Sequence, residues 1–425
     1  MTKRARIHVC TVGCRANQAD SAALERGLDG ARFEAVDGLD RADVVVINTC
    51  CVTSAAERDC RKLVRRAARA SAEAAIVVTG CAVTAIPGFV DGLRGVEPGR
   101  VVGAPDPRSL AAALDRVAAP ERPEIARPRA SGRTRALLKV QNGCSHGCAY
   151  CIVPAARGEE RSTPIAEAVR GAARLAEEGY REIVLTGVQL GAWGAELPGR
   201  PRLAELVAKV ADGFAPGRVR LSSVEPWSVD AALLDVVGGH PRVCPHLHVP
   251  IQSGADRILG LMGRGYTVRD FEAIAGAARS RIPDLAFGTD VLCGFPTETE
   301  EEHRLSLRAV AEMGLTYVHA FPYSPRPGTA AAALGRRPGR AVARDRVREV
   351  RAAGEALQRR FVESQLGAER EAIVEGSRGP AARGLTDNFL PVELAGAVEI
   401  GALVRVRIED RGRGSRARAV VISLK

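Results

Sequence analysis

Short apolar runs alternate with helix-like stretches along the N-terminal part of the chain. The runs occupy residues 7–12, 44–47, 76–79 and 101–102. Between them, residues 18–28 and 55–69 repeat apolar positions at the interval of an amphipathic helix. Strands that alternate with helices favour a parallel sheet whose two faces are both covered. The pattern therefore predicts an N-terminal α/β domain over residues 1–118.

A second and longer strand–helix series follows a proline-rich stretch. Residues 119–134 contain Pro120, Pro123 and Pro128 among polar positions, which indicates a linker. Strand-like runs then lie at residues 136–140, 182–186, 218–222, 246–250, 286–293 and 317–323. These six units, followed by a helix over residues 344–366, predict a partial (βα)6 barrel of parallel strands. The central domain is expected at residues 135–366.

The last part of the chain, residues 367–425, changes character. Short β-like runs at residues 371–374, 390–394, 403–408 and 418–422 are separated by turns that contain glycine. This spacing predicts a small antiparallel β-barrel. The fold class expected for the whole chain is therefore α/β, with three domains in this order.

The composition favours anionic partners, but the abundance of arginine weakens this inference. The 425 residues carry a formal net charge of +11, a balance that favours nucleic acid as a partner. However, lysine occurs only at positions 3, 62, 139, 209 and 425 among the 61 basic residues, so arginine is abundant everywhere and a single arginine is uninformative. No apolar run is long enough for a membrane span or a signal peptide, which favours a soluble cytoplasmic protein without a membrane partner.

Cysteines carry the strongest chemical signal. An odd number, eleven, without a secretory signal favours metal or cluster ligation over disulfides. Cys144, Cys148 and Cys151 form a C-x3-C-x2-C run directly after the first barrel strand. Three thiolates on one loop can hold three corners of a cubane cluster and leave the fourth iron open to a ligand. The alternative is a structural zinc loop with His146 or Cys293 as its fourth ligand.

Three further cysteines occupy equivalent places in the N-terminal domain. Cys14, Cys50 and Cys81 each follow one of its successive strands. Because the carboxyl ends of parallel strands meet at one edge of a sheet, these thiols are expected to converge. The alternative is chance placement of a small core residue. Cys51 adjoins Cys50, and either could be the ligand at this position.

These motifs resemble the radical-SAM methylthiotransferase family along the whole chain. The C-x3-C-x2-C run, with Tyr150 before its last cysteine, resembles the signature of enzymes that use S-adenosylmethionine (SAM) and a 4Fe–4S cluster. The segments that end in Cys14, Cys50 and Cys81 resemble the family's second cluster-binding region. The resemblance implies two 4Fe–4S clusters, SAM as a cofactor and a C-terminal barrel of the RNA-binding TRAM type. It assigns the SAM cluster and its catalysis to Cys144, Cys148 and Cys151, and the second cluster to Cys14, Cys50 and Cys81.

Strand ends of the central domain resemble SAM-contacting segments of the family. The positions that the resemblance implies are Tyr150, Thr186, Gly187, Ser223, Glu225, Gln252 and Asp290. Function in such barrels collects at the carboxyl ends of the strands, which suits these positions. Each could instead reflect turn chemistry alone.

Basic residues remain informative where their spacing or their position forms a pattern. Arg58, Arg61, Lys62 and Arg65 form a helical stripe opposite an apolar face, directly after Cys50. Arg405 and Arg407 form a second basic segment, in the domain that resembles TRAM. Both are candidate RNA contacts, and a solvated surface is the alternative for each.

The implied reaction converts a carbon–hydrogen bond into carbon–S–CH3 at carbon 2 of a modified adenosine at tRNA position 37. Residues 48–53 and 321–324 are most similar to the branch that acts on N6-threonylcarbamoyladenosine. The alternatives are N6-isopentenyladenosine in tRNA, a ribosomal protein aspartate or, in a different class, a non-enzymatic iron–sulfur RNA-binding protein. The implied partners are a tRNA anticodon stem-loop, a sulfur source and a low-potential electron donor such as flavodoxin or ferredoxin.

Overall fold

The computed structural model describes residues 4–30, 32–91, 93, 95–96, 99–117, 134–378, 381–396, 398–412, 414 and 416–424. The chain forms two compact units. The first contains Met1–Gly132, Asn142–Glu159 and Ser324–Ala332, and the second contains Arg133–Gln141, Glu160–Tyr323 and Ala333–Lys425. The linker expected at residues 119–134 lies, except for residue 134, outside the described residues. The loop that carries Cys144, Cys148 and Cys151 thus groups with the N-terminal sheet.

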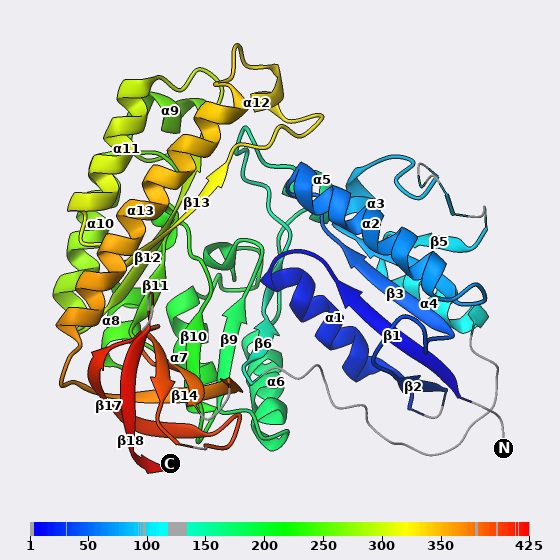
Figure 1. Cartoon of the computed structure of the whole chain (residues 1–425), viewed down its shortest axis with the longest axis horizontal. Coiled ribbons are helices and arrows are strands. Elements are labelled where there is room, and N and C mark those ends of the chain that lie inside the picture. The colour runs from blue at the N-terminus through cyan, green and yellow to red at the C-terminus, as the bar shows by residue number, and fades with distance from the viewer. Residues whose placement is uncertain are drawn as a thin grey trace. The chain divides into compact units, whose positions relative to one another are not determined.

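A five-stranded parallel sheet forms the centre of the first unit (Figure 1). Its strand order is β2-β1-β3-β4-β5. The strands are β1 (Ala5–Thr11), β2 (Phe33–Ala35), β3 (Val44–Thr49), β4 (Ala75–Gly80) and β5 (Val101–Ala104). The helices are α1 (Arg15–Gly27), α2 (Ser54–Ala70), α3 (Cys81–Ala85), α4 (Pro107–Val117) and α5 (Val153–Arg157). The four predicted strands are present, and β2 and α3 are additional short elements.

Alternation along β3 explains why both faces of this sheet are covered. Val45 and Ile47 belong to an apolar cluster with Val64 of α2. Val44 and Val46 belong to a second cluster, which includes residues of α1 and α4. Successive side chains of a strand point to opposite faces, so one apolar strand supports helices on both sides.

Six parallel strands form the partial barrel of the second unit, as predicted. One ladder has the order β10-β9-β6 and the other β11-β12-β13, and a bridge between Ser223 and His248 links them. The strands are β6 (Ala136–Lys139), β9 (Glu182–Thr186), β10 (Arg218–Leu221), β11 (His246–His248), β12 (Ala286–Cys293) and β13 (Tyr317–Pro322), and the short strands β7 (Gln141–Asn142) and β8 (Arg161–Ser162) pair with each other.

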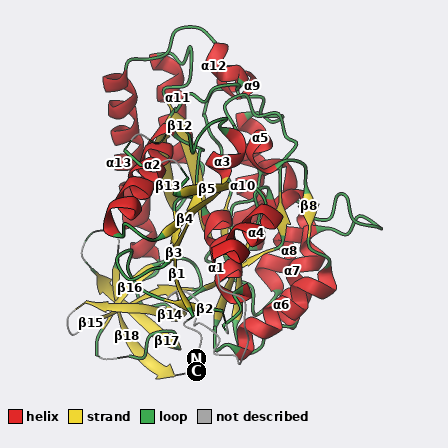
Figure 2. Ribbon diagram, turned by 90° about the vertical axis from the view of Figure 1, so that its right-hand side faces the viewer, coloured by secondary structure: helices red, strands yellow, loops and turns green. Residues whose placement is uncertain are grey.

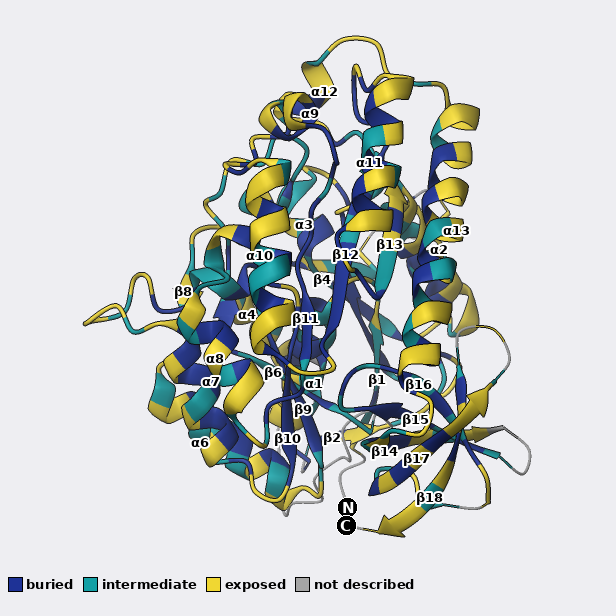
Figure 3. Ribbon diagram, turned by 90° about the vertical axis from the view of Figure 1, so that its left-hand side faces the viewer, coloured by how far each residue is buried: buried dark blue, intermediate teal, exposed yellow. Residues whose placement is uncertain are grey.

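Helices cover the outer face of the barrel. They are α6 (Ile165–Glu177), α7 (Leu203–Asp212), α8 (Ala231–Gly239), α9 (Asp256–Leu261), α10 (Val268–Arg281), α11 (Glu300–Glu312) and α13 (Arg340–Ser364). The short helix α12 (Ala330–Ala333) begins in the stretch Ser324–Ala332 of the first unit. Figure 2 shows α6, α7 and α8 side by side. Figure 3 shows β12 buried, with exposed and buried residues alternating along α11 and α13. Val347 and Val350 of α13 belong to the core, as an amphipathic helix requires.

The C-terminal residues form a closed five-stranded barrel. Its order is β14-β15-β16-β18-β17, for β14 (Glu369–Arg378), β15 (Ala381–Thr386), β16 (Pro391–Leu394), β17 (Leu403–Arg411) and β18 (Ala417–Leu424). β15 is absent from the predicted strands because its sequence, Ala-Ala-Arg-Gly-Leu-Thr, has weak alternation. Four of its strand pairs are antiparallel, as predicted, and the pair β16–β18 is parallel.

A buried ionic group joins this barrel to β9 and β10; we call Glu182, Arg218 and Arg220 the Glu182 cluster. The Glu182 carboxylate accepts from Arg218 Nε at 2.7 Å and from Arg220 Nε at 2.8 Å. The other guanidinium nitrogens donate to backbone carbonyls of Glu371, Leu385, Asp387 and Thr386 at 2.8–3.0 Å. Burial alone would raise the pKa of Glu182, but Arg220 and Arg218 outweigh it and hold that pKa at about 2.

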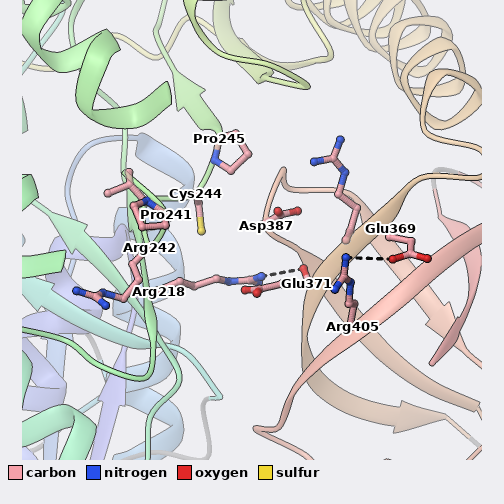
Figure 4. Close-up of a pocket in the computed structure, with 11 residues that line it drawn as sticks. Arg218, Pro241, Arg242, Cys244, Pro245, Glu369, Glu371, Asp387 and Arg405 are labelled. Carbon is pink, nitrogen blue, oxygen red and sulfur yellow. Dashed lines mark hydrogen bonds and ion pairs between the residues drawn. The ribbon is translucent and has the colours of Figure 1, made fainter. Parts of the chain in front are cut away.

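A cavity of about 300 Å³ lies beside the Glu182 cluster (Figure 4). Its lining includes Arg218, Arg242, Cys244, Glu369 and Arg405. Acidic and basic side chains alternate around it, and Arg405 pairs with Glu369 at 3.1 Å. The cavity therefore belongs to the junction between the two barrels, at the amino ends of β10 and β11.

Candidate functional site

Three cysteines lie at one edge of the N-terminal sheet. Cys14 precedes α1, Cys50 follows β3, and Cys81 is the first residue of α3, directly after β4. β1, β3 and β4 are neighbours, with Thr11 opposite Asn48 and Thr49 opposite Gly80. The strand register therefore places the three cysteines together.

Asn17 lies at the centre of this group. Its Oδ1 is 3.6 Å from Cys14 Sγ and 3.8 Å from Cys81 Sγ, and each thiol donates to it. Its Nδ2 donates to the Thr49 carbonyl at 2.7 Å and to the Val12 carbonyl at 3.1 Å. The fully buried Asn17 side chain thus forms hydrogen bonds with Cys14, with Cys81 and with the residue before Cys50.

Two glycines allow the chain segments that carry the three cysteines to pack closely against one another. Gly13 has φ +127°, and a Cβ there would lie 2.7 Å from Cys50 Cβ. Gly80 has φ +89°, and a Cβ there would lie 2.3 Å from Asn48 Oδ1. A side chain at either position would combine strain with a clash, so the thiol group depends on glycine here.

The neighbouring thiols Cys50 and Cys51 have different surroundings. Cys50 lies within electrostatic range of both Cys14 and Cys81. The Cys51 thiol donates to the Cys81 carbonyl at 3.4 Å and packs in the apolar core, with an exposed fraction of 0%. Cys60 of α2 is also 0% exposed, and its thiol accepts from the Cys50 amide at 3.3 Å. These contacts favour Cys50 as the ligand.

Burial keeps the Cys50 and Cys81 thiols in their neutral form when nothing is bound. It raises the pKa of Cys50 to about 12, and it also raises the pKa of Cys81, which Arg157 opposes. Ligation of iron by thiolates would therefore release protons. Among the described residues, no three His, Cys, Asp or Glu side chains are arranged around a single metal-ion position. In a 4Fe–4S cluster each iron takes its own thiolate, and three thiols at three strand ends fit that donor set.

The loop of Cys144, Cys148 and Cys151 is closed by backbone contacts. The Cys144 amide donates to the Gly158 carbonyl at 2.9 Å, and the Cys151 amide donates to the Cys148 carbonyl at 3.0 Å. All three cysteines are half-buried. Ile152 and Ala156, which follow the loop, pack in the same apolar cluster as Cys81. The loop is therefore anchored to the core of the first unit.

Arg157, the last residue of α5, contacts Cys81 in one cysteine group and the chain two residues before Cys144 in the other. Its Nε lies 3.3 Å from Cys81 Sγ. Its terminal nitrogens donate to the Oδ1 atoms of Asn17 and Asn142, both at 2.7 Å, and to Asp20 Oδ2 at 2.9 Å. Sequence analysis missed Asn17 and Arg157, since the contacts join residues 137 and 140 positions apart and arginine is abundant. In the sequence, the only indication of their role is that Asn17 follows Cys14 by three residues and Arg157 follows Cys151 by six.

Three of the predicted SAM contacts lie around the end of β11. Ser223 forms a bridge with His248, and the Gln252 amide donates to the Asp290 carbonyl at 2.9 Å. His248 Nε2 lies 3.0 Å from Asp290 Oδ1. Gln252 has φ +68°, an uncommon backbone conformation for a residue other than glycine. The structure therefore groups these positions at the carboxyl ends of neighbouring strands.

The other predicted SAM contacts have mixed surroundings. Thr186 ends β9 and is buried, and Gly187 packs so tightly that a Cβ would lie 2.9 Å from Gln141 Oε1. Glu225 forms an ion pair with Arg264, which is 4% exposed. Tyr150 is half-buried in the cysteine loop of the first unit.

The inner face of β13 contributes an aromatic surface, of which sequence analysis singled out Phe321 but not Tyr317 or His319. Tyr317, His319 and Phe321 alternate with residues that pack under the helices. The ring centroids of His248 and His319 are 5.4 Å apart, and Tyr317 hydroxyl lies 3.0 Å from His248 Nδ1. His319 and Phe321 are exposed. Exposed polar and aromatic side chains therefore lie side by side on this wall.

The candidate RNA contacts differ in their exposure and in whether they form ion pairs within the chain. Arg58 and Lys62 are exposed, and Arg65 is half-buried. Arg61 is paired with Glu57 at 3.3 Å and lies over the Phe89 ring at 4.5 Å. Arg405 and Arg407 both pair with Glu369, at 3.1 and 3.0 Å, while remaining more than half exposed.

Two parts of the chain match known families. Residues 6–90 match "Uncharacterized protein family UPF0004", and residues 138–310 match "Radical SAM superfamily". A radical-SAM methyltransferase, TsrM from Kitasatospora setae, shares the fold, with a TM-score of 0.56 at 16% identity over 78% of this chain and 77% of that chain. The barrel and the cysteine loop thus define a radical-SAM enzyme.

Relatives identify the family within this class. The chain is 31% identical to "Threonylcarbamoyladenosine tRNA methylthiotransferase MtaB" of Rickettsia prowazekii, over 96% of each chain. It is 33% identical to the Bacillus subtilis protein of that name, over 95% of this chain and 93% of that protein. It is 36% identical to "tRNA-2-methylthio-N(6)-dimethylallyladenosine synthase" of Chloroflexus aurantiacus, over 95% of this chain and 89% of that protein. The chain belongs to the radical-SAM tRNA methylthiotransferase family.

Family membership confirms the resemblance expected from the motifs. The chain is an enzyme of tRNA methylthiolation, and its cofactors are SAM and 4Fe–4S clusters. The alternative of a non-enzymatic RNA-binding protein is thereby excluded. None of the described helices has both the length and the apolar character needed to cross a membrane.

Proposed function

We propose that the chain methylthiolates carbon 2 of N6-threonylcarbamoyladenosine at tRNA position 37, next to the anticodon. In this proposal Cys144, Cys148 and Cys151 hold the cluster that binds SAM. Cys14, Cys50 and Cys81 hold a second cluster. The observation that carries the proposal is the convergence of three thiols from three strand ends around Asn17, in the compact unit that also contains the other three cysteines.

When bound, SAM and the first cluster supply a radical that removes hydrogen from carbon 2, and the second cluster supplies sulfur that a further SAM methylates. The residues of the chain bind and orient. Asn17 and the two glycines hold the thiols of the second site together. Ser223, Gln252 and Asp290 offer polar groups to SAM at the strand ends. The reaction also needs a low-potential electron donor, of the flavodoxin or ferredoxin type, and a source of sulfur.

The inner face of β13 supports threonylcarbamoyladenosine as the substrate. The threonylcarbamoyl group carries a carboxylate and a hydroxyl, whereas an isopentenyl group is apolar. His319 is an exposed imidazole on this wall, and it lies beside Tyr317 and His248, which are hydrogen-bonded to each other. Phe321 adds an exposed ring on which a base can stack. Several relatives named for threonylcarbamoyladenosine add support.

Isopentenyladenosine in tRNA is the second candidate. The observation in its favour is the 36% identity to a relative named for dimethylallyladenosine, which exceeds the 31–33% identity to the relatives named for threonylcarbamoyladenosine. Overall identity is therefore a weak guide to the substrate within this family.

Mass spectrometry of tRNA nucleosides from cells without this chain tests the substrate. The expected result is loss of the methylthio form of threonylcarbamoyladenosine and accumulation of its unmodified precursor, with recovery when the chain is supplied again. Loss of the methylthio form of isopentenyladenosine instead would support the second candidate. If both nucleosides kept their methylthio groups, neither substrate would stand.

A further inference from the structure

Arg157 occupies a position between the two proposed cluster sites. Its side chain is 9% exposed, although it follows Cys151 by only six residues. It donates to Cys81, to Asn17 and, on the other side, to Asn142, two residues before Cys144. One guanidinium therefore contacts a proposed ligand of one cluster and the chain that enters the ligand loop of the other.

The acceptors around Arg157 are arranged for a planar guanidinium. Nε and the two terminal nitrogens form a rigid fork, so bonds to Cys81, Asn142 and Asn17 fix three segments at once. Asn17 Oδ1 also accepts from Cys14, so the contact extends to a second proposed ligand. A lysine could keep the charge but could not reproduce this set of directions.

A simple ion pair with Asp20 does not account for the geometry. The Asp20 carboxylate, at 2.9 Å, satisfies one terminal nitrogen, while Nε points at sulfur, 3.3 Å away. A neutral thiol is a weak acceptor, whereas a thiolate that ligates iron accepts a charge-assisted bond. The contact thus becomes strong when Cys81 binds iron.

We propose that Arg157 is a positioning residue that fixes the Cys81 ligand against the loop of Cys144, Cys148 and Cys151, and that its positive charge tunes the reduction potential of the second cluster. This inference rests on the cluster assignment of the proposed function. Hydrogen bonds to the sulfurs and nearby charge set the potentials of iron–sulfur clusters. A cation beside a ligand favours the reduced, more negative state, so its removal lowers the potential.

The test isolates the second cluster. A parent chain with Cys144→Ala, Cys148→Ala and Cys151→Ala, reconstituted anaerobically, carries only the cluster proposed for Cys14, Cys50 and Cys81. In this parent, Arg157→Gln is expected to lower the midpoint potential in a titration followed by electron paramagnetic resonance. It is also expected to speed the loss of iron to a chelator by roughly tenfold, the lower end of the effects of outer-shell partners on metal affinity.

Two further variants separate charge from geometry and from general packing. Arg157→Lys is expected to keep the potential close to that of the parent but to lose iron faster, because the charge remains without the fork. Arg100→Gln is the matched control. Arg100 also anchors segments of the first unit, through the carbonyls of Ala68 and Ser71, without contact to a cysteine. It should change neither quantity.

The outcomes distinguish this inference from its foundation. If the parent binds no cluster, the second-cluster assignment fails and the inference fails with it. If the parent binds a cluster, and Arg157→Gln matches Arg100→Gln in potential and iron loss, Arg157 alone is misassigned. Should Arg157→Gln fail to fold by circular dichroism, Arg157→Lys decides: iron loss at the parent rate overturns the positioning role, and faster loss at an unchanged potential supports it.

Discussion

Two arginine-centred contacts anchor segments of this chain in different chemical settings. In the Glu182 cluster, Arg218 and Arg220 find one buried carboxylate and four backbone carbonyls. Arg157 finds one carboxylate, two amide oxygens and a thiol. The first set of acceptors is complete at neutral pH. The second gains its full strength only when the thiol becomes a ligand.

The difference indicates what each contact is for. A buried carboxylate between two arginines keeps its charge whatever the chain binds, so the Glu182 cluster is expected to contribute to stability. A thiol with a raised pKa is neutral until iron displaces its proton, so the Arg157 contact is expected to respond to the cluster. The comparison predicts that variants in the two regions affect activity and stability separately.

The largest effect is expected in the region of Arg157. Cys148→Ala should abolish the cleavage of SAM to 5′-deoxyadenosine under anaerobic reduction, since three thiolates are needed to hold the cluster with one open iron. Iron per chain should fall by about one cluster, while the unfolding of the C-terminal barrel stays unchanged. Cys244→Ala is the control, because Cys244 is a buried thiol of the second unit and should keep both iron and cleavage. Cleavage retained in Cys148→Ala would contradict the assignment.

A large effect on stability is expected in the Glu182 cluster. Glu182→Gln keeps the size of the side chain but leaves two buried guanidiniums without a compensating charge, which costs about 3–5 kcal/mol. Hydrogen exchange of the β15 and β16 amides measures the local free energy of opening. Glu375→Gln, which removes the partly exposed partner of Arg135, should cost at most about 1 kcal/mol. Equal effects of the two changes would mean that the cluster contributes little.

Acid should weaken the Glu182 cluster. Its arginines hold the pKa of Glu182 at about 2, below the ordinary value of 4.5. A group whose pKa is lowered by folding contributes stability above its ordinary pKa, and this contribution disappears as the pH falls from about 4.5 towards 2. The opening free energy of β15 should therefore fall over this range in the parent chain. In Glu182→Gln this part of the pH dependence should be missing.

The smallest effect is expected on α2, which carries both exposed basic side chains and basic side chains that are held by contacts within the chain. Lys62 is exposed, with an ion pair to the exposed Asp59 at 3.5 Å, whereas Arg61 is half-buried between Glu57 and the Phe89 ring. If α2 contacts tRNA phosphates, Lys62→Ala should weaken binding several-fold and lower the salt dependence by about one counterion. Arg61→Gln should leave the salt dependence unchanged. Filter-binding titrations with a tRNA anticodon stem-loop at several salt concentrations measure both.

The sequence predicts the elements well where one physical pattern dominates. Runs such as residues 44–47 are apolar on both faces, which only a covered parallel strand explains. The six barrel strands and α13 follow from the same kind of pattern. The missed elements have weak patterns: β2 is three residues long, and β15 contains a glycine and little alternation.

Only those residues of the candidate site that directly follow strands can be placed from the sequence. Cys14, Cys50 and Cys81 follow successive strands, and the parallel topology is sufficient to bring them together. The preference for Cys50 over Cys51 is different, because it depends on which way each side chain points from an irregular backbone. Arg157 contacts Asn17 and Asp20 over more than 130 positions, and Asn17 contacts Cys81 over 64 positions, which no local pattern encodes.

The composition of the first unit from three stretches of chain has a consequence for synthesis on the ribosome. All six proposed ligand cysteines are made by residue 151, but the unit also needs residues 324–332, whose Arg326 pairs with Glu57 at 2.7 Å and whose Ser324 hydroxyl accepts from the Ser54 amide at 3.0 Å. At translation rates of about 5–20 residues per second, these residues arrive roughly 10–40 s later. During this interval the thiols belong to an incomplete unit, so cluster insertion before the chain is released would meet a site that is still open at the start of α2.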